Sequence, residues 1–452
     1  MFSKRIAFLS LALFIGSIPC VARAQQLSFI RDAEIETTIR IYATPLFQQA
    51  GVEPSAVHIY LVNSRDINAF VAEGLNLFLN TGLIVKTRNA SELVGVIAHE
   101  SGHIAGGHLL RGANTMKNAS YEALAAALLG IAAGIASGHG DLGGAIAGAG
   151  NDIAVRNYLA FSRSIEGTAD TAALRFLDNL HESSKGFLDF METLKDEEGL
   201  QAENQDPYVR THPLTQDRID EIRHHVETSP WTNAALPPQY DEMQKRIVAK
   251  LIAFLYPPGE ALRKYPESDK SIPARYARAI ASYRIPDLNT ALPLIDGLIA
   301  ERPDDPYFHE LKGQMLYENA RVAEAVPEYQ QAVKLKGDNS LLRTELGTAE
   351  IASENQAYLK DATDNLKFAT QQEPENSDAW LQLSTAYARL NNDPMAEAAL
   401  AEYSLLMNKF PEAIFHSERA MKLLPRGTPV ELRMEDVRVA AEQGRDKAKE
   451  DR

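Results

Sequence analysis

The chain has 452 residues, enough for two or three domains, and its 45% hydrophobic and 24% charged residues favour a globular protein over a disordered one. Its 46 Lys and Arg against 61 Asp and Glu give a formal net charge of −15 without a basic block, which excludes the electrostatic pattern of a nucleic-acid-binding protein. A single cysteine, Cys20, excludes a disulfide scaffold and a cysteine-ligated structural zinc site.

The N-terminus has the features of a secretory signal peptide. Lys4 and Arg5 precede the apolar run Ile6–Ile18, and the small-x-small sequence Ala22-Arg23-Ala24 follows. We expect cleavage after Ala24, which removes residues 1–24 and leaves an exported chain without cysteine, suited to an oxidising compartment such as the periplasm. A retained membrane anchor is the alternative, and it is less favoured because the apolar run is short for a membrane span.

Residues 25 to about 118 alternate helix-like and strand-like patterns. One strand-like run precedes the next helix by a short connection, and it consists of Asn76, Leu77, Phe78, Leu79 and Asn80. This run is either an edge strand or an internal strand of a small sheet.

The most informative motif is His99-Glu100-Ser101-Gly102-His103. Two histidines four residues apart on a helix lie on one face about one turn apart, so both imidazoles can bind one Zn²⁺, and Glu100 projects beside them. The apolar run Leu93–Ala98 before the motif predicts a buried helix, as such a site needs. Two core histidines without a metal are the disfavoured alternative.

The segment at residues 119–155 is rich in Ala and Gly, and Ala123–Ala136 contains only Ala, Leu, Ile and Gly. It is too short and too weakly hydrophobic to predict a transmembrane helix. A buried helical hairpin is the simplest interpretation, and a hairpin that touches a membrane or a partner is the alternative.

A catalytic zinc site needs a third protein ligand, which has to come from downstream. The candidates are His108, His139, Glu166, Asp170, His181 and His212. Glu166 and Asp170 lie four residues apart on an expected helix and share a face, so one carboxylate can bind the metal while the other orients a ligand imidazole. Pro213 biases His212 toward an extended backbone, so this imidazole can project from a loop as a fourth ligand.

The proline-rich segment Ser229–Pro238 predicts a domain boundary, which divides residues 25–232 from residues 233–452. Beyond it, sets of mostly apolar residues on one helix face recur, and they begin at Ala291, Ala325, Ala362, Ala396 and Ala413. The first spacing of 34 residues resembles tetratricopeptide repeats, which stack helix pairs into an α-solenoid with a concave binding face. The spacings of 37 and 17 residues depart from that period, and a generic helical bundle is the alternative.

The motifs of the N-terminal half resemble the zinc peptidases of the HtpX and BepA group. The resemblance covers residues from about 30 to 225, in the group's order, through Asn68-Ala69-Phe70 with Leu77–Leu83, His99–His103, Glu166-x-x-Ala169-Asp170, and Thr211–Leu214 with Arg218-Ile219. It implies that His99, His103 and Glu166 bind one Zn²⁺ per chain, that Glu100 is the catalytic base, and that Asp170 supports a ligand histidine.

The same resemblance implies two further roles. The run Asn76–Asn80 would be an edge strand that pairs with extended substrate through main-chain hydrogen bonds. His212 would act as a regulatory fourth ligand that latches the site by excluding the attacking water.

We therefore expect a mainly α protein: a helical zincin-type metallopeptidase domain with a small β-sheet at residues 25–232, followed by an α-solenoid of tetratricopeptide repeats at residues 233–452. The resemblance implies a gluzincin-type zinc endopeptidase that degrades misfolded or stalled outer-membrane proteins, with a chaperone or assembly role through the repeats. Its expected partners are unfolded envelope proteins and the outer-membrane assembly machinery. The alternative function is an envelope chaperone or assembly factor with a latched, mostly silent zinc site.

Overall fold

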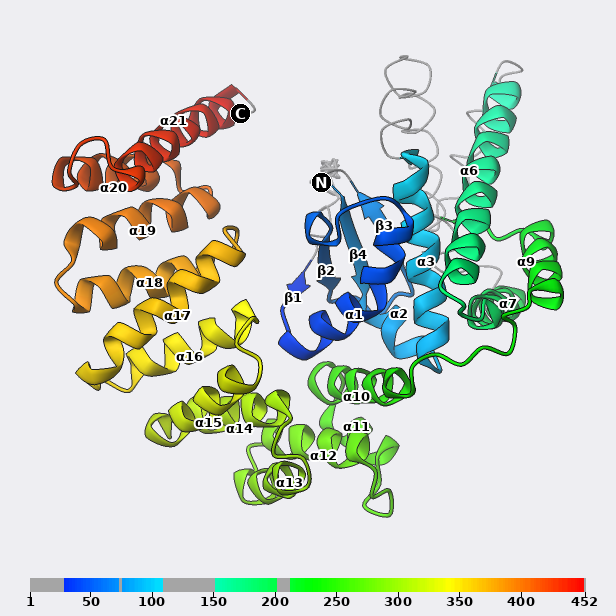
Figure 1. Cartoon of the computed structure of the whole chain (residues 1–452), viewed down its shortest axis with the longest axis horizontal. Helices are drawn as coiled ribbons and strands as arrows, with labels where there is room; N and C mark the ends of the chain where they lie inside the picture. The colour runs from blue at the N-terminus through cyan, green and yellow to red at the C-terminus, as the bar shows by residue number, and fades with distance from the viewer. Residues whose placement is uncertain (1–27, 73–74, 109–150, 201–211, 451–452) are drawn as a thin grey trace, which may run out of the picture.

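The computed structural model describes residues 28–72, 75–108, 151–200 and 212–450. Figure 1 shows the segments from β1 (Phe29–Ile30) to α9 (Gln216–Thr228) on the right, and a curved array of helices that begins below them at α10 (Pro238–Leu255) and rises on the left to α21 (Pro429–Glu450). The predicted fold class, mainly α with a small sheet followed by a solenoid, is confirmed. The predicted signal peptide and residues 119–150 lie outside the described residues. Among the residues that the structure describes, no helix is long and apolar enough to cross a membrane.

Four short strands form one sheet in the order β1-β2-β4-β3. Strands β2 and β4 pair in parallel, whereas β1 and β3 pair antiparallel at the two edges. Successive side chains point to opposite faces, and Leu61, Leu77 and Leu79 are buried on the inner face, in the N-terminal hydrophobic core. The remaining strands are β2 (His58–Val62), β3 (Ala69–Ala72) and β4 (Asn76–Asn80).

The prediction that the run Asn76–Asn80 is an edge strand is wrong. This run is β4, and Phe78 pairs with Tyr60 of β2 on one side and with Phe70 of β3 on the other. The alternation of apolar and polar side chains shows that one face of the strand is buried, and an edge strand and an internal strand share this pattern. The sequence therefore could not distinguish the two positions in the sheet. Among the described residues, β3 is the edge strand on this side of the sheet.

Helix α3 is the central helix of the N-terminal half. Asn89 caps its first turn by accepting a hydrogen bond from the backbone N–H of Glu92 at 3.0 Å, and Gly107 ends it in the left-handed conformation with φ of 59°. Almost all of its side chains are buried, as the apolar sequence predicted. The helices of this half are α1 (Ala33–Gln49), α2 (Thr81–Lys86), α3 (Ala90–Gly106), α6 (Asn151–Asn179), α7 (Lys185–Leu200) and α9.

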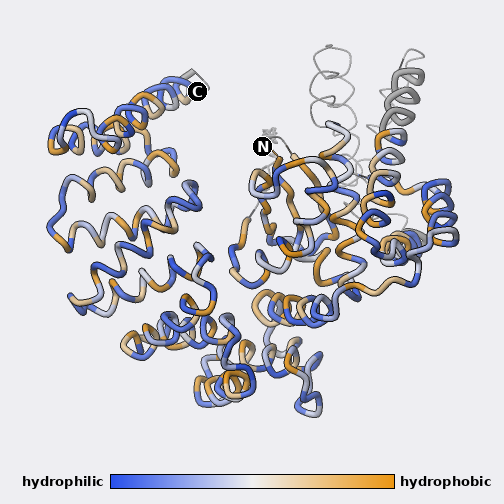
Figure 2. Tube along the Cα trace, viewed as in Figure 1, coloured by the Kyte–Doolittle hydropathy of each residue, from blue (hydrophilic) through white to orange (hydrophobic). Residues whose placement is uncertain are grey.

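The C-terminal array consists of antiparallel helix pairs, and Figure 2 shows hydrophilic and hydrophobic residues alternating along these helices. Four of the five repeating residue sets lie on the second helix of a pair, for example Ala291, Ile295 and Leu298, all fully buried on α13. The helices are α10, α11 (Pro258–Lys264), α12 (Ile272–Arg284), α13 (Leu288–Glu301), α14 (Pro306–Glu318), α15 (Val322–Leu335), α16 (Ser340–Ala352), α17 (Leu359–Gln372), α18 (Ser377–Arg389), α19 (Asp393–Leu406), α20 (Phe410–Leu423) and α21.

The structure explains both irregular spacings of the repeat. The long spacing coincides with a short 3₁₀ helix, Gln356–Tyr358, inserted between α16 and α17. The spacing of 17 residues is half a repeat, because the set that begins at Ala413 lies on α20, the first helix of the next pair, and not on a second helix.

Helix α10 joins the two halves. Tyr240, Ile247 and Leu251 belong to the core that contains the sheet and α3, whereas Ala249 and Ile252 belong to the core of the first repeats. The predicted division between residues 232 and 233 falls in the connection before α10. Because α10 packs into both cores, the packing alone does not assign this helix to one domain, and the division stays a prediction.

Buried charges tie the start of α1 to the solenoid. Glu34 lies 2.7 Å from a guanidinium nitrogen of Arg246, and the Tyr276 hydroxyl donates a hydrogen bond to it at 2.9 Å. The ammonium group of Lys250, which is 1% exposed, lies 2.7 Å from Asp32 and 3.3 Å from Glu310. These contacts hold the sheet side of the N-terminal half against α10, α12 and α14.

A buried carboxyl group inside the solenoid makes its stability depend on pH. Glu350 on α16 is 1% exposed, and burial raises its pKa to about 7, although Asn365 donates a hydrogen bond to it. Between the ordinary glutamate pKa of 4.5 and about 7, the folded chain therefore binds more protons than the unfolded chain, and the free energy of unfolding falls as the pH rises.

We predict that Glu350→Gln abolishes this loss. At pH 5 the variant and the parent should unfold at similar temperatures, whereas at pH 8 the variant should be more stable by about 1–3 kcal/mol, because only the parent keeps a buried charge. Thermal unfolding of the full chain followed by circular dichroism measures this, with the exposed Glu412→Gln as the control that should change nothing. An equal difference at both pH values would contradict the assignment.

Candidate metal centre

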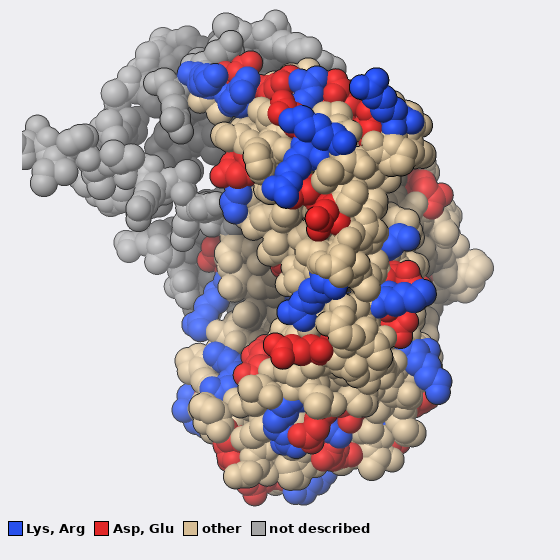
Figure 3. Space-filling model, turned by 90° about the vertical axis from the view of Figure 1, so that its left-hand side faces the viewer, with Lys and Arg blue, Asp and Glu red and all other residues tan. Residues whose placement is uncertain are grey.

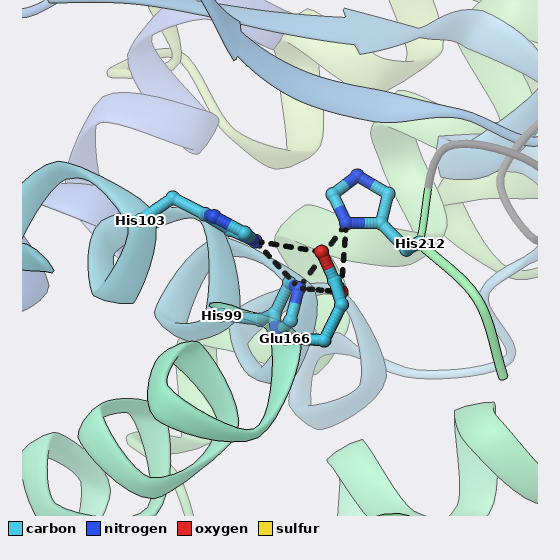
Figure 4. Close-up of side chains that lie close together, drawn as sticks. All are labelled: His99, His103, Glu166 and His212. Carbon is cyan, nitrogen blue, oxygen red and sulfur yellow. Dashed lines mark hydrogen bonds and ion pairs between the residues drawn. The ribbon is translucent and has the colours of Figure 1, made fainter. Parts of the chain in front are cut away.

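Two imidazoles of α3 face the same point. His99 and His103 are 0% and 9% exposed, and their Nε2 atoms lie 3.2 Å apart. Figure 4 shows both rings directed toward Glu166 and His212, which come from other segments of the chain. The predicted spacing of one helical turn therefore brings the two rings together in the core.

Helix α6 supplies the carboxylates. Glu166 is 3% exposed, and its oxygens lie 3.4 Å from His99 Nε2 and 3.6 Å from His103 Nε2. The close approach of α6 requires the glycine of the motif, because a Cβ at Gly102 would stand 2.5 Å from the Ala169 carbonyl oxygen. A side chain at Gly102 would push Glu166 away from the histidines.

Asp170 lies one turn further along α6, behind His99. One of its oxygens is 2.8 Å from His99 Nδ1, which leaves Nε2 of that ring for the metal centre. Arg218 of α9 is 4% exposed and binds both oxygens of Asp170, at 2.6 and 2.9 Å, and also lies 3.1 Å from Glu166. In the sequence Arg218 stands out only as part of a motif, and its contacts with the two carboxylates depend on the fold.

His212 reaches the centre from the segment that precedes α9. Its Nδ1 lies 3.1 Å from Glu166 and 3.4 Å from His99 Nε2, and its Nε2 lies 3.1 Å from the carbonyl oxygen of Ala69 on β3. The carbonyl of Pro213 accepts a hydrogen bond from Arg218 at 2.9 Å, which fixes the segment beside the centre. The extended segment expected from Pro213 therefore places this imidazole in the site.

One donor atom from each of His99, His103, Glu166 and His212 lies within 4.8 Å of all the others. Two atoms bound to one tetrahedral zinc ion at about 2.0–2.1 Å stand about 3.3 Å apart. Five of the six residue pairs have donor atoms 3.1–3.6 Å apart, close to that value; Glu166 uses one oxygen toward His99 and His212 and the other toward His103. Imidazole and carboxylate are ligands that zinc prefers, so the residues fit a zinc ion.

The surroundings shift the pKa values of the two motif histidines in opposite directions. Burial opposes protonation of His99, but Asp170 and Glu166 outweigh it and raise its pKa to about 10. Burial and the neighbouring His99 lower the pKa of His103 to about 2, and the imidazoles of His212 and His99 hold the pKa of Glu166 below its ordinary value despite burial. A ligand has to be deprotonated, so metal binding and proton release are coupled at His99.

Glu100 lies next to the donor set and is 1% exposed. Neither of its carboxylate oxygens has a hydrogen-bond partner among the described residues, and the nearer one lies 3.6 Å from His212 Nε2. Burial raises its pKa above the ordinary value. A buried carboxylate without a partner is costly, and a water molecule held at the centre would satisfy it.

Two other candidate ligands among the described residues, His108 and His181, do not belong to the donor set. His108 lies behind His103, with 3.1 Å between their Nδ1 atoms, so it contacts a ligand instead of acting as one. His181 stacks on Trp231 at a ring distance of 4.0 Å, outside the donor set. His139 lies outside the described residues.

Comparison with known proteins places these motifs in one family. Residues 30–226 match the family described as "Peptidase family M48". The chain is similar to the "Beta-barrel assembly-enhancing protease" of Yersinia pestis, 25% identical over 393 residues that cover 85% of this chain and 79% of that protein. It is also similar to the "Putative beta-barrel assembly-enhancing protease" of Vibrio cholerae serotype O1, 27% identical over 83% of this chain and 77% of that protein.

Among solved structures, "Crystal structure of YrrB: a TPR protein with an unusual peptide-binding site" covers 40% of this chain and 94% of that chain, at 19% identity and a TM-score of 0.33.

We predict that Glu166→Ala weakens zinc binding by at least about 100-fold, because it removes a charged donor from the buried set. Zinc retained by the purified full chain during titration with a chelator measures the affinity. The matched control is Glu221→Ala, which removes an exposed carboxylate of α9 and should leave the affinity unchanged. Equal zinc retention by the parent and Glu166→Ala would remove this residue from the ligand set.

Proposed function

Because residues 30–226 form a peptidase family M48 domain, and the chain is therefore a metalloprotease, we propose that it holds one zinc ion and cleaves unfolded or stalled proteins of the cell envelope. The observation that carries the proposal is the buried donor set His99, His103, Glu166 and His212, with the carboxylate of Glu100 beside it, which accepts no hydrogen bond from the described residues. A structural zinc site would need no such carboxylate next to its ligands.

In the proposed site, His99, His103 and Glu166 hold the zinc ion. When bound, zinc acidifies the attacking water and polarises the scissile carbonyl. Glu100 would take the proton from that water and return it to the leaving amine, and burial, which raises its pKa, favours its acceptance of a proton. Asp170 and Arg218 keep His99 and Glu166 in place during these transfers.

Strand β3 is the proposed docking edge for the substrate backbone. It is the free edge of the sheet beside α3, and its Ala69 carbonyl points to His212 at the centre. An extended polypeptide that pairs with β3 would place its backbone near Glu100 and the zinc ion. Main-chain pairing selects few side chains, which suits the cleavage of unfolded proteins.

His212 is proposed as a latch that occupies the fourth ligand position. In the geometry described here it contacts both Glu166 and the Ala69 carbonyl, so it covers the metal centre and the docking edge together. Displacement of the segment that carries it would free both. A partner would achieve this by binding the open state better than the closed one.

The closed geometry of His212 also favours the second candidate function, an envelope assembly factor whose zinc site is mostly silent. Under this hypothesis the solenoid carries the activity, by binding envelope proteins or the outer-membrane assembly machinery on its concave face. Basic and acidic side chains are interspersed on the solenoid side shown in Figure 3, a pattern suited to protein partners and not to nucleic acid.

The proposed location is the periplasm, with a signal peptide cleaved after Ala24. The names of the relatives, which refer to β-barrel assembly, support substrates among outer-membrane proteins. Contact of the Ala/Gly-rich segment 119–155 with a membrane stays a hypothesis, since most of it lies outside the described residues.

We predict that Glu100→Gln lowers the turnover of an unfolded protein such as casein by about 100- to 10,000-fold, because it removes the base while keeping the shape of the side chain. Zinc content and the circular dichroism spectrum should match those of the parent. Cleavage near the parent rate with zinc bound would contradict the assignment of the base.

We predict that His212→Ala raises basal cleavage of the same substrate by about tenfold or more, because the fourth position is then open. Zinc should stay bound through His99, His103 and Glu166. The matched control is His181→Ala, which removes a histidine outside the donor set and should leave the rate unchanged. Unchanged or lower activity with full zinc would rule out the latch, and loss of zinc would make His212 an essential ligand.

A further inference from the structure

The outer face of the sheet carries one aromatic ring from each strand. The ring centroids of Phe29 and Tyr60 lie 5.8 Å apart, those of Tyr60 and Phe78 lie 5.0 Å apart, and those of Phe78 and Phe70 lie 4.8 Å apart. The rings follow the strand order β1-β2-β4-β3 and cross the whole sheet. We refer to Phe29, Tyr60, Phe78 and Phe70 as the aromatic row.

The aromatic row lies outside the hydrophobic cores of the described residues. None of its rings is among the residues that form those cores or pack against them. Phe29 is 48% exposed, and the other three rings are partly exposed. A sheet that buries one face usually carries polar side chains on the other, and an apolar outer face is typical of an interaction surface.

Mutual stacking explains only part of this arrangement. Aromatic pairs across neighbouring strands stabilise a sheet, and the nearly parallel rings of Phe70 and Phe78, at 10°, are such a pair. The ring of Phe29 lies at the far edge and contacts both Tyr60 and Phe78, yet Phe29 stays 48% exposed. Ring contacts that stabilise the sheet therefore do not explain why Phe29, at the end of the row, is exposed.

One end of the row lies on β3, the strand of the proposed docking edge, with its ring on the face of the sheet away from the core. Phe70 follows Ala69, whose carbonyl contacts His212 at the metal centre. At the other end, the Tyr60 hydroxyl lies 3.4 Å from Glu375, and Arg31 pairs with Glu373 at 2.8 Å, both in the connection before α18. The row therefore leads from the solenoid to the docking edge beside the proposed zinc site.

We propose that the aromatic row binds an extended segment of an unfolded outer-membrane β-barrel protein, and guides it to β3. Strands of such proteins alternate apolar and polar residues and carry aromatic residues near both membrane interfaces. In an extended chain the side chains of one face recur every two residues, so several can lie on the row at once, ring against ring. This inference rests on the proposed function and adds a preference for aromatic side chains.

The experiment measures binding without cleavage. The probe is a fluorescent ten-residue peptide in which Tyr and Phe alternate with Ser and Thr, and the reference peptide has Ala in place of every aromatic residue. Each is titrated with the full chain carrying Glu100→Gln, and fluorescence anisotropy gives Kd. We expect the aromatic peptide to bind about tenfold or more tightly than the reference.

The test variant adds Phe29→Thr and Tyr60→Thr, because Thr keeps the strand propensity while removing the rings. It should weaken binding of the aromatic peptide by about tenfold and leave the reference peptide unaffected. Tyr60→Phe, which keeps the ring and loses the hydroxyl, should bind like the parent. Phe415→Thr, which removes a ring that is 57% exposed on α20, is the matched control and should also bind like the parent.

Several outcomes would overturn the proposal. Equal binding of the two peptides, or of the parent and the double variant with an unchanged circular dichroism spectrum, would remove the row from substrate binding. A dimer seen by sedimentation that the double variant loses would assign the row to a second copy of the chain. Failure of the wild-type chain to cleave unfolded protein would instead contradict the proposed function, and it would leave the binding result intact.

Discussion

The arrangement of the metal centre depends on the ion pair between Arg218 and Asp170. Two carboxylates of α6, Glu166 and Asp170, are buried one turn apart, and without an opposing charge their burial would cost several kcal/mol. Arg218 lies within 3.1 Å of both and is itself buried. The same side chain holds the Pro213 carbonyl, so one guanidinium group fixes the proposed third ligand Glu166, the carboxylate that supports His99 and the segment of His212.

Arg218 is therefore a common support for Glu166 and for the segment that carries His212. The position of His212 and the orientation of Glu166 are not independent, because Arg218 contacts the elements that carry both. A movement of α9 that opened the latch would also loosen the contact to Glu166. Opening of the proposed site is therefore expected to involve α9 as a unit, and not a rotation of the His212 ring alone.

The two halves of the chain share more than a linker. Helix α10 packs into both cores, and the buried charges of Asp32, Glu34, Arg246 and Lys250 bind the start of α1 to the solenoid. Because α1 also lies in the core of the sheet, the solenoid, the aromatic row and the proposed docking edge have defined relative positions. A protein bound by the solenoid could thus be presented to the sheet without a change in the arrangement of the two halves.

The local properties of the chain were determined by its sequence alone: the buried helix around His99 and His103, the face shared by Glu166 and Asp170, and the helix pairs of the solenoid all follow from spacings of a few residues. The position of β4 inside the sheet, the closeness of α6 at Gly102, and the role of Arg218 were decided by the tertiary structure. These features depend on which segments become neighbours in the fold. Neither the alternating pattern of a strand nor a single arginine in the sequence identifies the segment that it will contact.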